Sequence, residues 1–447
     1  MHFVGVAGAG MSALAELLVR RGVHVTGCDA AAATADLEQR GVSVVLGHDP
    51  SHVEGAQAVV VTSAMRADHP ELARARALGV PVIRRAEALA AAIEGGTVVA
   101  VAGTHGKTTT TVMTTEALAA AGLEPTGIAG GRVGQWRGNV SEGSDGLFVV
   151  EADEYDRSFL ALSPDVAVVT NVEADHLDIY ANVGEILDAF AQFVRGAHRI
   201  ILCAEDPGAM SLPLPASAEI IRYGIRAPDA RLVAREVEAT AGGSRFIAVY
   251  DGEDVSSVEL VVPGRHNVLN ALAALGVGLS LGADGAALAR GLARFHGVER
   301  RFQRIGDAGG VTVVDDYAHH PTEIRATLAA ARSAFPNRRI VAAFQPHLYS
   351  RTRDFADDFG AALAGADAIY LTEIYPAREQ PIDGVTSDLI ARSLRRASGT
   401  LAWRGERGDL ADALARGVRP GDVVLVLGAG DITRTAPELV ARLTAAA

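Results

Sequence analysis

The sequence predicts an α/β protein of three domains: a Rossmann-like domain at each end, and between them a domain of the phosphate-loop ATPase type with a parallel sheet. Three observations predict this class. Short apolar runs alternate with helical stretches along most of the chain, as in βαβ units. A length of 447 residues suits about three domains of ordinary size. A glycine-rich loop lies between an apolar segment and a helical pattern in the first third of the chain.

Composition narrows the class of protein further. Apolar residues make up 49% of the chain and charged residues 21%, as in ordinary globular proteins. The formal net charge of -13 argues against a nucleic-acid partner, because binding to the phosphate backbone needs a basic surface. Cys28 and Cys203 are too few for a disulfide framework. No apolar run suggests a leader peptide or a membrane span. We therefore expect a cytoplasmic monomer or homodimer without nucleic-acid or membrane partners.

Residues 1–94 are predicted to form a small βαβ domain with a mainly parallel sheet. Its first turn, from Gly5 to Ser12, lets the backbone approach a ligand at a helix N-terminus. Asp29 follows about twenty residues on, where a ribose-reading acid would lie. The glycine spacing departs from G-x-G-x-x-G, so a turn that only packs a helix on a strand remains the alternative. Further candidates at strand ends are His48, Thr62 and Ser63.

The central domain, predicted over residues 95–297, carries the run GTHGKTTTT from Gly103 to Thr111. Backbone N–H groups of such a loop point at an anion, and Lys107 supplies a mobile positive charge. Thr108 is placed to ligate Mg²⁺. The loop is a short variant, because Val101 stands where the usual motif has its first glycine. Lys107 is nevertheless the only lysine in the chain, and an arginine could not imitate its compact ammonium. The alternative is a turn that caps a helix without a ligand.

Two later apolar segments of the central domain end in the acidic runs EADEYD and VEADHLDIY. The carboxyl ends of parallel strands meet at one edge of a sheet, so Glu151 and His176 are expected beside Lys107. A carboxylate there can bind Mg²⁺, and a neutral imidazole can hold a second ion. The alternative is that the two side chains cap helices or satisfy hydrogen bonds of the core.

Residues 218–262 show β-like runs, which predict a small antiparallel insert or sheet edge. A helix then opens with His266, Asn267 and Asn270. The two asparagines are three residues apart and share a face, which suits contacts to adenine or phosphate. An asparagine N-cap would explain one of them without a ligand.

The third domain is predicted over residues 298–447 as a second Rossmann-like unit. Strands are expected near residues 312–318, 338–345, 368–375 and 422–431, with a helix over 321–335. Polar groups at three successive strand ends favour a site over a solvated surface. These groups are Asp315, Asp316, His319, His320, His347, Ser350, Arg351, Arg353, Glu373 and Arg378.

Taken together, these motifs resemble the Mur ligase family, the ATP-dependent amide-forming ligases of peptidoglycan precursor synthesis. The segments GVAGAGMS, GTHGKTT, EADEYDRSFL, TNVEADHLDIY, PGRHNVLNA, DDYAHHPTE, QPHLYSRTRDF and LGAGDI follow the order of the family over nearly the whole chain. The resemblance implies an N-terminal domain for the UDP-sugar, a central ATPase and a C-terminal domain for the amino acid. It also implies ATP and Mg²⁺ as cofactors, and the small molecules UDP-N-acetylmuramate and L-alanine as substrates.

The resemblance assigns roles by position. Lys107 matches the lysine on the β- and γ-phosphates, Thr108 and Glu151 match Mg²⁺ ligands, and His176 matches the ligand of a second Mg²⁺. His319 and Arg351 match groups that close over the reacting carboxylate and the amino acid. The nucleotide would lie against Gly103, Thr104, His105, Gly106, Lys107, Thr108, Thr109, His266, Asn267, Asn270 and Arg301. The UDP-sugar would lie against Gly8, Gly10, His48, Thr62 and Ser63.

The sequence departs from the family at two points. Leu348 stands where many relatives have arginine in QPHRYSRT, so that contact must be absent or supplied elsewhere. Several branches of the family use a carbamylated lysine at the second metal, which is impossible here because Lys107 is the sole lysine.

Three other functions remain open from the sequence. A recycling ligase would add a preformed tripeptide to UDP-N-acetylmuramate, although VEADHLDIY favours the branch that adds L-alanine. An NAD-dependent oxidoreductase would use the turn from Gly5 to Gly10 but leaves Lys107 and Glu151 unexplained. A nucleotide-dependent regulatory protein would keep the fold without ligation.

Overall fold

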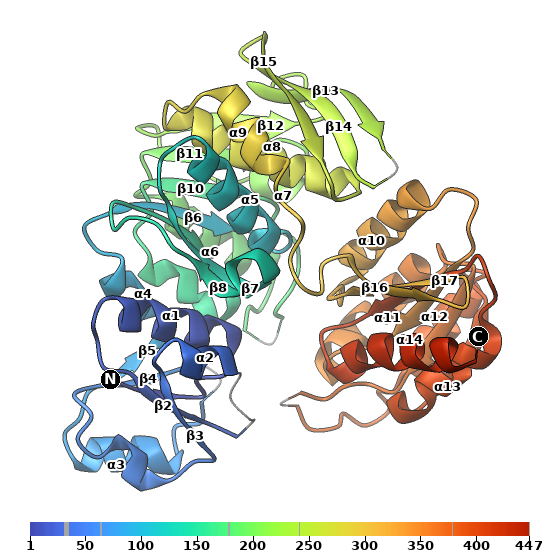
Figure 1. Ribbon diagram of the computed structural model, residues 1–447, viewed down its shortest axis with the longest axis horizontal. Helices are drawn as coiled ribbons and strands as arrows, with labels where there is room; N and C mark the ends of the chain where they lie inside the picture. The colour runs from blue at the N-terminus through green and yellow to red at the C-terminus, as the bar shows by residue number, and fades with distance from the viewer. Residues whose placement is uncertain (31–34, 63–64, 178, 241, 378, 447) are drawn as a thin grey trace.

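The structure is a computed structural model that describes residues 1–30, 35–62, 65–177, 179–240, 242–377 and 379–446. It contains three sheets of five, ten and six strands, one for each expected domain. Figure 1 shows the N-terminal domain in blue and the C-terminal domain in orange and red, both beside the central domain. The predicted α/β class with three domains is confirmed. The boundaries at residues 94/95 and 297/298 stay predictions.

The N-terminal sheet is parallel throughout, in the order β3-β2-β1-β4-β5. Its strands are β1 (His2–Val4), β2 (Thr26–Asp29), β3 (Ser43–Leu46), β4 (Val59–Val61) and β5 (Val82–Arg84). Its helices are α1 (Ala9–Arg20), α2 (Ala35–Gln39), the 3-10 turn η1 (Pro50–Val53), α3 (Pro70–Ala77) and α4 (Arg85–Ala92). The turn between β1 and α1 uses Gly5 at φ 82°, a conformation that favours glycine.

The central sheet has the order β15-β14-β13-β12-β11-β10-β6-β9-β7-β8. Its strands are β6 (Thr97–Ala102), β7 (Thr126–Val133), β8 (Gly138–Ser141), β9 (Leu147–Glu151), β10 (Val166–Val169), β11 (Arg199–Cys203), β12 (Glu219–Gly224), β13 (Leu232–Ala239), β14 (Ser244–Tyr250) and β15 (Glu253–Leu260). Its helical segments are α5 (Lys107–Ala120), η2 (Gly134–Trp136), η3 (Tyr155–Ala161), α6 (Val183–Val194), α7 (Pro207–Met210), α8 (Arg265–Ser280) and α9 (Gly285–Leu292). The expected antiparallel insert is an edge of this sheet, because β13 pairs parallel with β12 and antiparallel with β14.

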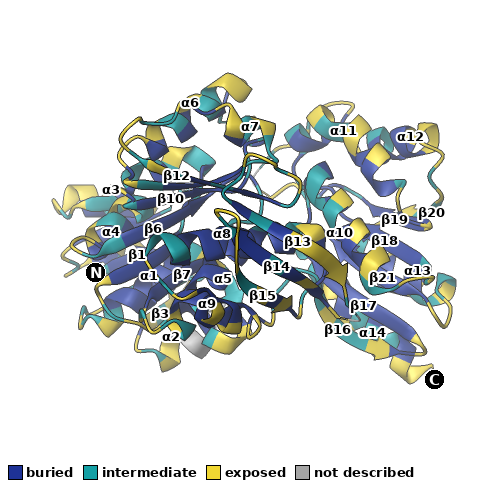
Figure 2. Ribbon diagram, turned by 90° about the horizontal axis from the view of Figure 1, so that it is seen from above, coloured by how far each residue is buried: buried dark blue, intermediate teal, exposed yellow. Residues whose placement is uncertain are grey.

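The middle of the central sheet is buried on both faces. Along β6, Val98 and Ala100 belong to one hydrophobic cluster, whereas Val99 and Val101 belong to another on the opposite face. The first cluster continues into the N-terminal domain through Phe3 of β1, so these two domains share a core. Figure 2 shows the buried strands between partly exposed helices, and the exposed end of β13. This packing fixes the strand ends that carry the candidate site.

The C-terminal sheet has the order β16-β17-β21-β18-β19-β20, with β16 antiparallel to β17. Its strands are β16 (Gln303–Ala308), β17 (Val311–Asp316), β18 (Ile340–Phe344), β19 (Ala368–Thr372), β20 (Leu401–Gly405) and β21 (Val423–Leu427). Its helical segments are α10 (Pro321–Ala334), α11 (Tyr349–Leu363), α12 (Asp388–Arg396), α13 (Arg407–Gly417), η4 (Asp431–Arg434) and α14 (Thr435–Ala445). The four predicted strands are present, and β16 and β20 extend the sheet beyond the prediction.

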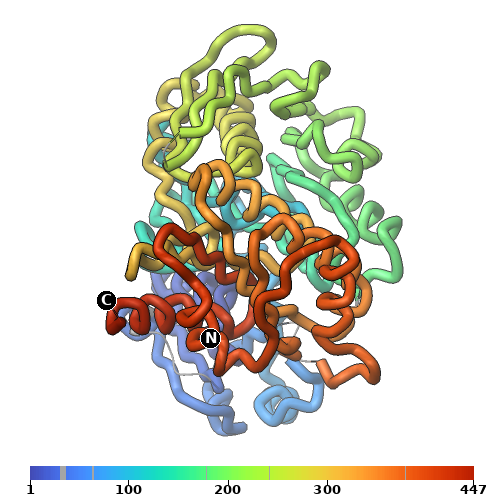
Figure 3. Tube along the Cα trace, turned by 90° about the vertical axis from the view of Figure 1, so that its right-hand side faces the viewer, coloured from blue at the N-terminus to red at the C-terminus, as the bar shows by residue number. Residues whose placement is uncertain are grey.

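The C-terminal domain meets the central domain through α10, which contacts α8. Figure 3 views the molecule from the side of the C-terminal domain, with this domain in front of the other two. Among the described residues, none of the helices combines the length and the apolar character needed to cross a membrane.

Candidate active site

The predicted phosphate loop joins β6 to α5, and two glycines allow its shape. Gly106 has φ 83° and Gly103 has φ 142°, both unfavourable for other residues. A Cβ on Gly103 would lie 1.9 Å from Thr170 Oγ1, so the strand end of β10 also requires glycine there. Asn171 braces the loop, because its Oδ1 accepts a hydrogen bond from the His105 backbone N–H at 2.8 Å. The loop is therefore built against the carboxyl end of β10.

Lys107, the first residue of α5, points into this loop rather than into solvent. Its Nζ donates to the Gly103 carbonyl at 2.7 Å and to Glu154 at 2.7 and 2.9 Å. Burial alone would lower the pKa of Lys107, but Glu154 and other nearby carboxylates raise it well above its usual value. Burial alone would raise the pKa of Glu154. The charge of Lys107 has the larger effect, so the pKa of Glu154 is lowered overall. The two side chains are thus a buried ion pair.

The structure brings the predicted Mg²⁺ ligands to the same place. Glu151 ends β9, and its Oε2 accepts a hydrogen bond from the Gly130 backbone N–H at 2.6 Å. Burial raises the pKa of Glu151, against the charge of Lys107 and a hydrogen bond from Thr108. His176 Nε2 lies 3.5 Å from Glu154 Oε1.

This donor set fits magnesium. A hydroxyl from Thr108 and the carboxylate of Glu151 are oxygen ligands of the kind that Mg²⁺ prefers. Two carboxylates, the buried Glu154 and the half-buried Glu151, lie near one lysine, so a divalent cation would balance the local charge.

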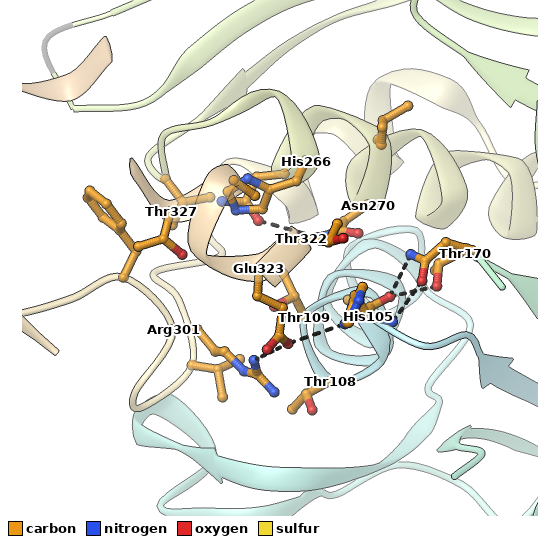
Figure 4. Close-up of a pocket in the computed structure, with 18 of the residues that line it drawn as sticks. His105, Thr108, Thr109, Thr170, His266, Asn270, Arg301, Thr322, Glu323 and Thr327 are labelled. Carbon is orange, nitrogen blue, oxygen red and sulfur yellow. Dashed lines mark hydrogen bonds and ion pairs between the residues drawn. The ribbon is translucent and has the colours of Figure 1, made fainter. Parts of the chain in front are cut away.

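Next to the loop, a cavity of about 240 Å³ lies between the central and C-terminal domains. Figure 4 shows side chains from α5, α8 and the C-terminal domain around this cavity. Eight predicted nucleotide-binding residues line it: His105, Gly106, Thr108, Thr109, His266, Asn267, Asn270 and Arg301. The other predicted residues of the loop, Gly103, Thr104 and Lys107, are not among those that line it.

Two helices fix the polar groups of this cavity. On α8, Asn270 Oδ1 accepts a hydrogen bond from Thr110 Oγ1 at 3.1 Å, which ties α8 to α5. Burial lowers the pKa of His266 to about 4, so its imidazole is neutral at pH 7. Apolar walls that the motifs do not reveal come from Val262 and Phe295. A cavity with apolar walls and a few placed polar groups is typical of a nucleotide-base site.

The C-terminal domain closes over the loop through buried charges. Arg351 Nη2 donates to Asp175 Oδ1 at 2.5 Å, and both side chains are buried. Burial raises the pKa of Asp175, but Arg351 outweighs it and holds this pKa far below its usual range. Arg351, His176 and Leu348 line one small cavity between the domains. In this cavity Leu348 offers no charge, and Arg351 is the one arginine among the described lining residues.

A second group of contacts joins the same two domains around His105. Its Nδ1 lies 3.5 Å from Glu323 Oε1, and its Nε2 lies 3.8 Å from Glu173 Oε2. Thr322 Oγ1 also donates to Glu173 at 2.7 Å. Burial would lower the pKa of His105, but the two carboxylates raise it to about 9. The interface is therefore held by charge as well as by shape.

His319 lies in this interface beside Glu323. Its Nδ1 is 2.9 Å from the Tyr317 carbonyl oxygen and 3.1 Å from Glu323 Oε2. Both partners accept hydrogen bonds, so Nδ1 carries the proton and Nε2 is the basic nitrogen. Burial lowers the pKa of His319, against the charge of Glu323.

The other polar strand ends of the C-terminal domain serve different contacts. Asp315 accepts a hydrogen bond from Thr433 Oγ1 at 2.5 Å, and Glu373 accepts one from Ser387 Oγ at 3.1 Å. Arg353 is exposed and pairs with its neighbour Asp354. Arg378 lies outside the described residues. The polar residues predicted at these strand ends therefore do not all belong to one site.

A separate cavity of about 240 Å³ lies between the N-terminal and central domains. The predicted substrate residues Gly8, Gly10 and Thr62 line it, together with Glu151 and Arg85. Arg85, the first residue of α4, was not predicted from the sequence. Among the described residues that line this cavity, it is the one with a positively charged side chain. A guanidinium here suits an anionic ligand such as a diphosphate.

Two predicted substrate residues do not join this cavity. His48 lies instead against Cys28, with Nδ1 3.4 Å from Sγ, and 3.5 Å from Glu71 Oε2. Ser63 lies outside the described residues. Asp29, expected to read a ribose, accepts a hydrogen bond from the Ala7 backbone N–H at 2.9 Å and so holds the glycine turn.

Families of known proteins match the chain in three consecutive segments. Residues 1–97 match the Mur ligase family, catalytic domain; residues 101–278 match the Mur ligase middle domain; and residues 300–430 match the Mur ligase, glutamate ligase domain.

Individual relatives match over nearly the full length. A UDP-N-acetylmuramate–L-alanine ligase of Burkholderia thailandensis is 45% identical over 97% of this chain and 95% of its own. The ligase of the same name from Laribacter hongkongensis is 47% identical over 98% of this chain and 97% of its own.

Solved structures give the same result. The UDP-N-acetylmuramate-alanine ligase of Thermotoga maritima is 31% identical with a TM-score of 0.85, covering 100% of this chain and 99% of that chain. A murein peptide ligase of Psychrobacter arcticus is 26% identical with a TM-score of 0.73. The match covers 99% of this chain and 98% of the chain of that ligase. The chain therefore belongs to the Mur ligase family.

Proposed function

We propose that the protein is an ATP-dependent ligase that joins L-alanine to the lactyl carboxylate of UDP-N-acetylmuramate. One structural observation carries the proposal. Thr108 lines the cavity of the nucleotide, Glu151 lines the cavity of the N-terminal domain, and the two side chains are in contact. A terminal phosphate and a carboxylate substrate bound in the two cavities would meet at this point. The names of the relatives at 44–47% identity supply the identity of the substrates.

The chemistry follows from the charge at that point. A carboxylate does not acylate an amine directly, because oxide is a poor leaving group. Attack of the lactyl carboxylate on the γ-phosphate of ATP gives an acyl phosphate and ADP, and the amine of L-alanine then displaces phosphate. Both reactants of the first step are anions, so positive charge at their meeting point lowers the barrier. Lys107 supplies that charge from the loop, and Mg²⁺ held by Thr108 and Glu151 would add to it.

The structure favours His319 over His176 as the group that takes the proton of the amine. The pKa of His319 is lowered by burial, so it is neutral at pH 7 with Nε2 as acceptor. Burial also lowers the pKa of His176, but Glu154 and Asp175 outweigh it and raise this pKa, which favours the protonated form. We therefore assign His319 to the amine, and His176 in its protonated form to a contact with phosphate. Binding of the second metal by His176 would first require the loss of that proton.

Contacts across the interface support a role for domain closure. Arg351 reaches Asp175 of the central domain, and Thr322 reaches Glu173. A closed interface excludes water, which would otherwise hydrolyse the acyl phosphate. We place the reaction in the cytoplasm, where ATP is available, and we keep a monomer or a homodimer as the expected assembly.

One assay tests the function. The protein is incubated with ATP, Mg²⁺ and UDP-N-acetylmuramate together with L-alanine, glycine, L-serine or the tripeptide, and phosphate release is measured. We expect release that depends on L-alanine. Release that depends only on the tripeptide would favour the recycling reaction, and release that depends on no acceptor would refute the ligase.

A further inference from the structure

A second cluster of metal-ligating side chains lies in the N-terminal domain, outside the proposed reaction. Its members come from four elements, namely β1, β2, η1 and α3. Each offers one ligand atom, and all four atoms lie within 4.8 Å of one another. We call it the Glu71 cluster, and its members are His2, Cys28, His52 and Glu71.

Glu71 is the centre of the cluster and is completely buried. Both of its carboxylate oxygens lie 3.2 Å from Cys28 Sγ, and Oε1 lies 2.9 Å from His52 Nδ1. Its ion-pair contacts within the described chain are all with histidines, and none is with an arginine. A buried carboxylate without a permanent cation is unfavourable unless hydrogen bonds or a metal ion compensate its charge.

Two histidines next to Glu71 have buried nitrogens without a hydrogen-bond partner. His2 is 2% exposed, and its Nε2 has no partner among the described residues. His69 Nδ1 is likewise buried without a partner, 3.9 Å from Glu71 Oε2. Buried polar atoms are rarely left unpaired, and a neutral imidazole is the form that binds a metal.

The spacing and chemistry of the cluster suit zinc. In a tetrahedral Zn²⁺ site with bonds of about 2.0–2.3 Å, the ligand atoms lie roughly 3.3–3.7 Å apart. The contacts of 2.9–3.2 Å around Glu71 are slightly shorter, so small outward shifts would admit the ion. One sulfur, two imidazole nitrogens and one carboxylate form a ligand set that zinc accepts. We propose that His2, Cys28, His52 and Glu71 form a structural Zn²⁺ site in the N-terminal domain.

The position of this site gives it a function. The Cys28 carbonyl oxygen accepts hydrogen bonds from the backbone N–H groups of Gly5 and Val6, at 2.8 and 3.1 Å. These residues begin the glycine turn that lines the cavity of the N-terminal domain. An ion on Cys28 therefore fixes β2 beneath the turn and holds η1 and α3 to the sheet. Four protein ligands leave no open position, which is typical of structural rather than catalytic zinc.

Cobalt absorption tests the site in the full-length protein. The protein is stripped with a chelator and titrated with Co²⁺ in excess Mg²⁺, which occupies the oxygen ligands at the phosphate loop. We expect one equivalent of Co²⁺ with a thiolate charge-transfer band in the near ultraviolet. Cys28→Ser should lose this band, whereas Cys203→Ser, a change at the other buried cysteine, should keep it. A wild-type protein without the band, or a band that follows Cys203, overturns the proposal.

Thermal unfolding gives a second measurement that does not depend on cobalt. Zn²⁺ should raise the Tm of the wild type and of Cys203→Ser, because an ion that binds only the folded state stabilises it. If Cys28→Ser does not fold, His52→Gln replaces it, because His52 lies in a short surface turn. This variant should bind Co²⁺ at least about tenfold more weakly than the wild type. Unchanged affinity in His52→Gln would also refute the site.

Discussion

Lys107 Nζ lies 2.7 Å from Glu154 Oε2 and 2.9 Å from Glu154 Oε1, so the only lysine of the chain is held by a buried carboxylate. The same carboxylate lies 3.5 Å from His176. Glu154 thus links the lysine of the phosphate loop to the histidine expected at the second metal.

Lys107→Ala should almost abolish ADP formation while binding of the UDP-sugar survives. The ammonium is the charge that draws the two anions together, and the N-terminal cavity does not include it. Loss of one such group lowers kcat by about 10²–10³. Lys107→Arg should not restore activity, because a planar guanidinium cannot make the contacts of Nζ with both Gly103 and Glu154. The measurement is phosphate release together with calorimetric binding of UDP-N-acetylmuramate. Normal turnover in either variant would contradict the assignment.

Gly130→Ala should weaken binding of Mg²⁺ without unfolding the protein. A Cβ on Gly130 would lie 2.6 Å from Glu151 Oε1, so the carboxylate must move away from Thr108. The neighbouring atom is the end of a flexible side chain, so the fold can adjust. We expect the Mg²⁺ concentration for half-maximal activity to rise about tenfold.

Gly134→Ala is the matched control for this change, because a Cβ there meets no atom within 4 Å. A titration of activity with Mg²⁺ should separate the two variants. Equal Mg²⁺ dependence in both would show that Glu151 does not bind the ion.

Much of the fold could be predicted because buried strands are continuous apolar runs. Two strands of the C-terminal domain were missed for a physical reason. The strand β16 reads QRIGDA and the strand β20 reads LAWRG, and both are largely half-buried or exposed at sheet edges. Edge strands of this kind lack the apolar signal that marks β6 or β21.

The site was predictable where its residues follow strands, and not where it depends on turns or domain packing. EADEYD contains four carboxylates, and nothing in their order along the chain indicates that Glu154 is the one that pairs with Lys107. The pair of Arg351 with Asp175 joins residues 176 positions apart, across two domains. His48 follows a strand as expected, but the buried Glu71 lies beside it. No local pattern carries such information.

Arg351→Met should open the interface between the central and C-terminal domains. Removal of one partner of a buried ion pair costs about 3–5 kcal/mol, because Asp175 is left charged and buried. We expect a larger radius of gyration in small-angle scattering and a fall in kcat of at least about tenfold, with ATP binding retained.

The double variant Asp175→Asn/Arg351→Met separates the two roles of Arg351. It removes the unpaired charge, so the compact shape should return. Activity should stay low, because Arg351 is proposed to contact the reacting groups. Recovery of activity together with shape would mean that Arg351 serves closure alone.

The contacts of His105 should make stability depend on alkaline pH. The pKa of His105 in the folded protein is about 9, above its reference value of 6.5. A raised pKa means that the folded state holds the proton more tightly than the unfolded state. The stabilisation is therefore complete below about pH 6.5 and is lost as the pH rises through about 9. It amounts to at most about 3.5 kcal/mol, since each pKa unit corresponds to about 1.4 kcal/mol.

His105→Gln isolates this effect, with His198→Gln as the control at an exposed histidine of the same domain. Thermal unfolding between about pH 6 and pH 10 should show that the wild type is more stable than His105→Gln at the acid end. That difference should shrink as the pH approaches 9, because neutral His105 no longer pairs with Glu173 and Glu323. His198→Gln should follow the wild type throughout. A constant difference between the wild type and His105→Gln would mean that the imidazole contributes by packing rather than by its charge.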